Sequence, residues 1–217
     1  MPKNMPAISY SKEGTNPVVD SSNSSYKIPF YKSNEYFTNY DSYINFIKAT
    51  ERLVRSDDRY KKYIAYLKNE VHLNRCQVLK GVTSEDDGVT IELHHGPIFT
   101  LFDYCAIILE YFLIKDWKIS TYRIADAVLT EHQKNRIQCV MVSATVHEEI
   151  HAGNIFIPYT MAYGDLASFI KKYNTAISPE YKDQVNRYID RSLLYDPNDF
   201  GVLDLNPELY KKGNDND

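Results

Sequence analysis

The stretch Val89-Thr90-Ile91-Glu92-Leu93-His94-His95-Gly96-Pro97 decides how this chain is organised. Its apolar and polar residues alternate up to the histidines, which is the pattern of a strand with one buried face. Gly96-Pro97 ends that strand. Because neighbouring side chains in a strand point to opposite faces, His94 and His95 are expected to meet different surroundings.

A second pair of histidines lies further along the chain. Ile137–Val142 is apolar and predicts a second strand, and the residues after Ser143 predict a short helix that ends at Gly153. His147 and His151 are four residues apart, so they share one face of that helix. Imidazoles from a strand end and a helix face are suitable ligands for one divalent ion.

Helical patterns surround these two pairs. An apolar stripe runs from about residue 40 to 73, with a predicted helix cap at Ser56-Asp57-Asp58. Cys76–Lys80 predicts an additional strand, joined to Val89–His95 by a glycine-closed turn. Phe99–Leu113 and 120–133 predict helices inserted between the two histidine pairs, and 164–173 and 179–194 predict two more helices after them.

Composition limits the function without naming it. The 25 Lys+Arg and 29 Asp+Glu residues give a formal net charge of −4, but residues 40–80 contain nine basic and five acidic residues. This local excess suits either a phosphate-binding face or a solvated helix surface. The three widely spaced cysteines favour buried free thiols in a reducing cytoplasm. No apolar run is long enough for a membrane span, and the N-terminus lacks the apolar core of a signal peptide.

The order strand, His-His, inserted helices, strand, His-x-x-x-His helix resembles the HNH, or ββα-metal, nuclease superfamily over about residues 89–153. The nuclease colicin version is the most similar. The resemblance implies that His94, His147 and His151 bind a divalent ion (Zn, Mg, Mn or Ni) and that His95 is the general base. Asn135 and Gln138 both stay open as the residue that orients the base.

The fold class that follows is α+β, with a small ββα-metal-like core, inserted helices, flanking N- and C-terminal helices and flexible tails. The expected divisions are a flexible N-terminal arm at 1–38, a helical region at 39–74, the core at 75–160, C-terminal helices at 161–195 and an acidic tail at 196–217.

The implied function is a metal-dependent endonuclease that hydrolyses phosphodiester bonds of DNA, or of RNA as the less expected substrate. It would act in the cytoplasm of a bacterial or phage-infected cell, away from membranes, with the N-terminal arm available to a protein partner. One alternative is a non-catalytic nucleic-acid-binding or phage assembly protein with a degenerate HNH-like fold. Another is a zincin-like peptidase, since Glu148 completes His-Glu-x-x-His. In a third, the histidines are ordinary polar surface residues.

Overall fold

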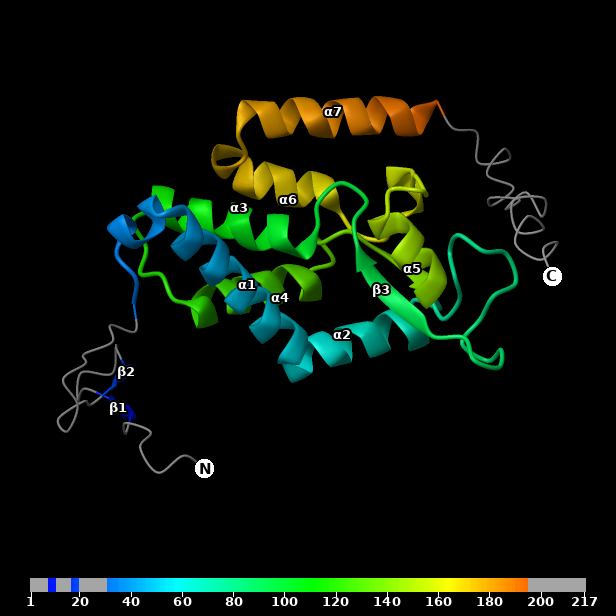
Figure 1. Ribbon diagram of the computed structural model, residues 1–217, viewed down its shortest axis with the longest axis horizontal. Helices are drawn as coiled ribbons and strands as arrows, with labels where there is room; N and C mark the ends of the chain where they lie inside the picture. Colours follow the sequence, from blue (N-terminus) through cyan, green and yellow to red (C-terminus); the bar gives the residue numbers. More distant parts are fainter. Residues whose placement is uncertain (1–7, 11–16, 20–30, 195–217) are drawn as a thin grey trace, which may run out of the picture.

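The computed structural model describes residues 8–10, 17–19 and 31–194. These residues confirm the α+β class, because they combine α-helices with a two-stranded antiparallel sheet of β3 (Ile91–His95) and β4 (Cys139–Ser143), which lies to one side of the larger helical part (Figure 1). Two short strands, β1 (Ile8–Tyr10) and β2 (Pro17–Val19), pair with each other within the expected N-terminal arm. The rest of that arm up to residue 30, and the expected acidic tail, lie outside the described residues.

The first helical region is divided at the predicted cap. A 3-10 helix, η1 (Asn34–Thr38), precedes α1 (Tyr40–Ser56), and α2 (Asp58–Asn69) follows after one residue. That residue is Asp57, whose side chain accepts a 2.8 Å hydrogen bond from the backbone N–H of Arg59. Asp57 therefore satisfies a first-turn donor of α2 and changes the direction of the chain.

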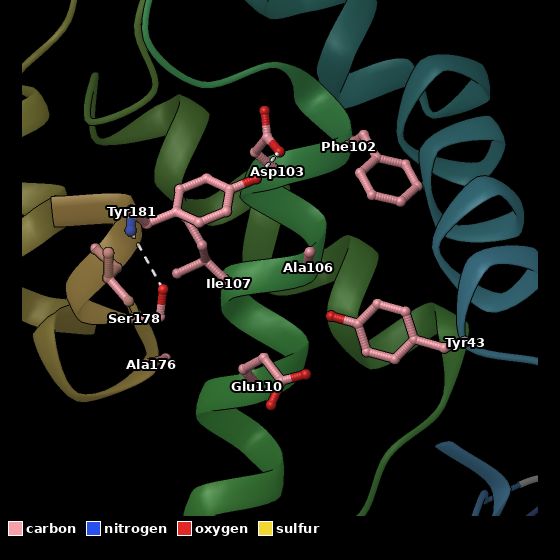
Figure 2. A pocket seen from close by; sticks show the side chains of 10 residues that line it. Tyr43, Phe102, Asp103, Ala106, Ile107, Glu110, Ala176, Ser178 and Tyr181 are labelled. Atoms are coloured by element: carbon pink, nitrogen blue, oxygen red, sulfur yellow. Dashed lines mark hydrogen bonds between the residues drawn. The ribbon is translucent and has the colours of Figure 1, made fainter. Parts of the chain in front are cut away.

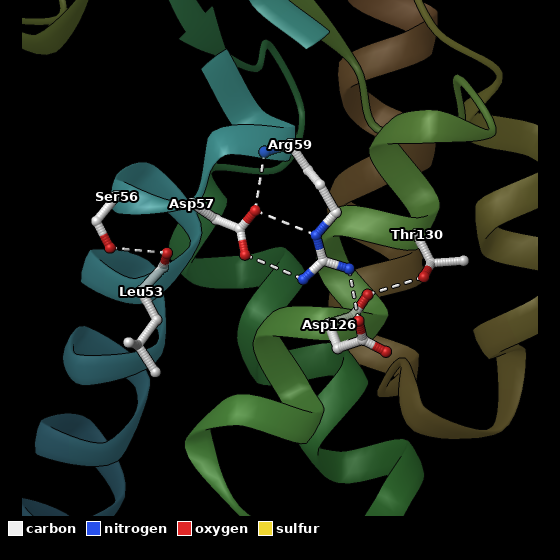
Figure 3. A network of polar contacts seen from close by, with 6 residues as sticks. All are labelled: Leu53, Ser56, Asp57, Arg59, Asp126 and Thr130. Carbon is white, nitrogen blue, oxygen red and sulfur yellow. Dashed lines mark hydrogen bonds and ion pairs between the residues drawn. The ribbon is translucent and has the colours of Figure 1, made fainter. Parts of the chain in front are cut away.

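Arg59 makes polar contacts from this junction to α4 (Thr121–Gln133), as Figure 3 shows. Its guanidinium donates to both carboxylate oxygens of Asp57, at 3.1 and 3.0 Å, and to Asp126 of α4 at 2.6 Å. The planar guanidinium can serve two carboxylates at once because it has several donors in one plane.

A helical core fills the larger part of the molecule. Its central helix is α3 (Leu101–Ile114), which begins with a capping box between Thr100 and Asp103 and is apolar on most sides. α1, α4, α6 (Leu166–Tyr173) and α7 (Pro179–Leu193) pack around it, with the short 3-10 helices η2 (Tyr159–Met161) and η3 (Asn174–Ala176) in the connections (Figure 1). Burial on several faces explains why the sequence of α3 is nearly continuously apolar.

The sheet consists of β3 (Ile91–His95) and β4 (Cys139–Ser143), joined through α3 and α4. The register pairs Ile91 with Ser143 and His95 with Cys139. α5 (Ala144–His151) leaves β4 directly and packs against both strands, over a second apolar cluster. The inserted helices and the short helix after the second strand are therefore as predicted.

The additional strand predicted at Cys76–Lys80 does not form. Gln77 occupies the edge of β4 instead: its N–H donates to the carbonyl of Met141 at 2.8 Å, and its side-chain Oε1 accepts from the N–H of Met141 at 2.7 Å. The side-chain oxygen of Gln77 thus accepts a hydrogen bond that a backbone carbonyl would accept in a neighbouring strand. β3 pairs with β4, which is distant in sequence, and not with the segment before it.

Candidate metal centre

The structure brings together the three histidines expected to bind metal. His94 ends β3, while His147 and His151 lie one turn apart on α5. The Nε2 atoms of His147 and His151 are 3.1 Å apart, and one ring nitrogen from each of the three residues lies within 4.8 Å of the others. Ligands of a tetrahedral zinc ion, at 2.0–2.1 Å from it, are separated by about 3.3 Å. A modest movement of one ring would bring the three nitrogens to this spacing.

Glu92 orients one of these histidines. It lies two residues before His94, hence on the same face of β3, and its Oε2 is 2.6 Å from Nδ1 of His147. A carboxylate can only accept here, so Nδ1 of His147 carries a proton; in the neutral ring that a metal requires, the lone pair is then on Nε2, which faces the cluster. A carboxylate behind a ligating histidine is the usual support of a metal site. Sequence reasoning missed Glu92, although its alternation with His94 could have indicated it.

His94 is held in the neutral form that ligation requires. Only 6% of its surface is exposed, and burial, followed by the neighbouring His147 and His151, lowers its pKa to about 4. The backbone also approaches its ring closely: a Cβ atom added to Gly96 would lie 2.9 Å from Nε2 of His94. His147 is half-buried and His151 is exposed, so one side of the cluster opens to solvent.

His95 lies on the opposite face of β3, inside the protein. Its Nε2 is 3.0 Å from Nε2 of His132 on α4, and its ring stacks on Tyr60 of α2. Nδ1 of His132 must donate to the carbonyl of Val128 at 2.9 Å, so its Nε2 accepts and His95 donates. Burial lowers the pKa of both histidines. This placement differs from the substrate-facing position that the nuclease resemblance implies for a general base.

The two candidates for an orienting residue lie in the approach to β4. Asn135 follows α4 with a positive φ of 53°, and Oδ1 of its side chain is buried without a hydrogen-bond partner among the described residues. Gln138 is buried, its carbonyl accepts from Gly96, and its Oε1 likewise has no partner in that part of the chain. Neither side chain has a hydrogen bond to His95, and both roles stay predictions.

Basic residues of the 40–80 region pair with acids inside that region and with Asp126 of α4 outside it. Lys61 pairs with Asp58 at 3.2 Å, and Arg59 is held by Asp57 and Asp126. A nucleic-acid partner for this surface also stays a prediction.

The family comparison favours one of the competing interpretations. The family described as "Bacteriophage G278-like virion protein" matches residues 7–214, nearly the whole chain. The chain belongs to this family. No curated protein and no solved structure matches it.

Membership of the G278-like virion family corrects the identification as an HNH nuclease. The local order of strand, strand and helix with its histidines is present, but that small pattern does not establish a nuclease family, and the prediction of an endonuclease is wrong. The phage assembly or structural alternative agrees better. None of the described helices is long and apolar enough to cross a membrane.

Proposed function

We propose that this protein is a structural component of the phage particle that binds one divalent transition-metal ion through His94, His147 and His151. The family supplies the virion context. The observation that supports the metal is the convergence of three imidazoles from two elements, one of them oriented by Glu92. Three imidazole nitrogen donors favour zinc and its neighbours over magnesium, which prefers oxygen.

The ion would act as a cross-link between α5 and the sheet. α5 has only eight residues, and Val146 is its one fully buried side chain among the described residues. So short a helix gains little from its own hydrogen bonds. A metal held by two residues of α5 and one of β3 would fix the helix against the strand, and its binding free energy would add to the stability of the fold.

Three protein ligands leave one position of a tetrahedral ion for water or for a group of a neighbouring chain. The same geometry would suit hydrolytic chemistry, so it is the virion family that favours a structural role. In that role the metal prepares a rigid surface around α5.

Thermal unfolding with and without zinc tests this function. Zinc at a hundredfold excess over its dissociation constant stabilises by about 2.7 kcal/mol, which raises the melting temperature of a protein of this size by about 5–10 °C. His151→Ala should abolish this shift. His72→Asn is the matched control, because His72 is exposed, lies outside the cluster and has a positive φ of 62° that asparagine tolerates. An equal shift in His151→Ala and wild type would contradict the proposal.

A further inference from the structure

A cavity of about 300 Å³, which none of the histidines lines, lies between α1, α3 and the start of α7 (Figure 2). Its floor is apolar, formed by Ala106 and Ile107 of α3 with Ile177. Phe102, Tyr43 and Tyr181 stand around it as aromatic walls. This volume is at the lower end for small-molecule sites, about 300–1,000 Å³, and suits a single long side chain.

Two carboxylates of α3 give the cavity its charge. Asp103 and Glu110 are seven residues apart, so they lie two turns apart on one face of the helix. Asp103 accepts a 2.8 Å hydrogen bond from the hydroxyl of Tyr181 and closes the capping box with Thr100, so it positions one wall. Within the described part of the chain, no lysine or arginine forms an ion pair with either carboxylate.

Because Asp103 already accepts hydrogen bonds from Tyr181 and Thr100, Glu110 is the carboxylate available to bind a ligand. It is half-buried and lies at the end of the cavity beside Tyr43, whose pKa is raised by burial and then by the charge and hydrogen bonding of Glu110. Beside the apolar floor the local dielectric is low, and this strengthens the attraction between a half-buried negative charge and a cation. The cavity therefore combines an apolar channel, aromatic faces and one acceptor that lacks a cation.

We propose that this cavity binds the side chain of an arginine from a neighbouring protein of the phage particle. The apolar floor would cover its methylene groups, the aromatic rings would stack on its guanidinium, and the oxygens of Glu110 would accept two parallel N–H donors. Arginine suits the site better than lysine, because its planar guanidinium can stack and bind in a bidentate manner. Phosphate is excluded by the two carboxylates, so nucleic acid is not the occupant.

The first test titrates N-acetyl-arginine amide into the full chain and follows the amide NMR signals of Ala106, Glu110 and Ser178. We expect saturable shifts in the millimolar range, no binding of the uncharged analogue N-acetyl-citrulline amide, and at least about tenfold weaker binding by Glu110→Gln. Glu180→Gln is the matched control, because Glu180 is exposed near the cavity but does not line it. Equal binding of both probes, unchanged affinity in Glu110→Gln, or absence of shifts at these residues would overturn the proposal.

The second test uses intact particles. A photoreactive benzophenone amino acid in place of Phe102, at the wall of the cavity, should cross-link to a segment of a neighbouring chain that contains an arginine. A cross-linked segment without arginine, or no cross-link in assembled particles, would count against an arginine in this cavity.

Discussion

Glu92 and His147 are joined by a 2.6 Å hydrogen bond between Oε2 and Nδ1, although fifty-five residues separate them in the chain. The bond ties β3 to α5 and sets the tautomer of His147, so that its Nε2 faces His151 and His94. The same contact therefore links the packing of α5 on the sheet to the geometry of the proposed metal site.

Removal of this carboxylate should weaken metal binding without removing a ligand. Glu92→Ala should lower zinc affinity by about 10–100-fold, the usual effect of losing a group that orients a ligating histidine. Isothermal titration with zinc measures it. Glu148→Ala is the control, since Glu148 is an exposed glutamate of α5 next to His147. If the two variants bind zinc equally well, Glu92 has no supporting role.

The buried pair of His95 and His132 should make the fold sensitive to acid. Burial lowers the pKa of His132 from 6.5 to about 4, so the unfolded chain takes up a proton that the folded chain refuses. The stability that the neutral, buried His132 provides is fully present above about pH 6.5. As the pH falls toward 4, the free energy of unfolding decreases by about 3 kcal/mol in all. Urea unfolding of metal-free protein across this range measures the loss. The stability of His132→Gln should depend less steeply on pH. An identical slope in wild type and variant would show that other groups cause the acid sensitivity.

Gly164 should be hard to replace. Its φ is +124°, and an added Cβ would lie 2.4 Å from the carbonyl oxygen of Ile137, beside the point where Tyr163 and Cys139 exchange two backbone hydrogen bonds. Gly164→Ala should lower the free energy of unfolding by about 3 kcal/mol or more, because of backbone strain and the clash. Gly81→Ala, with φ +83° and open space around the added Cβ, should cost only about 1–2 kcal/mol. Chemical denaturation measures both losses of stability. If the two variants lose similar amounts, the close approach of Gly164 to the carbonyl of Ile137 is refuted.

The ion pair of Arg59 and Asp126 should contribute little despite its short distance. The side chains are 38% and 64% exposed, so water and salt screen the charges. A double-mutant cycle with Arg59→Ala and Asp126→Ala should give a coupling energy below about 1 kcal/mol. A value above about 2 kcal/mol would show that this contact, drawn in Figure 3, is a main fastening of α2 to α4.

Local patterns were sufficient for the helices and for the histidine cluster. Asp57 interrupts the apolar stripe, and the structure begins α2 there. Helical spacing puts His147 and His151 on one face, and strand alternation separates His94 from His95.

Long-range packing could not be read from the sequence. Gln77 adds to β4 through its side chain, and His95 meets His132 from a helix thirty-seven residues away. The sequence around His95 does not indicate whether this side chain faces a buried partner or a substrate cleft. The family was also misread, because a few histidines at metal-binding spacing occur on a local strand and helix arrangement whatever the function of the whole chain.

The metal content of the purified protein tests the central claim most directly. After growth with zinc and removal of loosely bound ions by gel filtration, elemental analysis should find one zinc ion per chain in the wild type and in His72→Asn, and almost none in His147→Ala. His147→Ala should keep its helical content by circular dichroism, because the helical core does not include the cluster. Zinc-free wild-type protein that cannot be loaded, or undiminished zinc in folded His147→Ala, would contradict the metal centre.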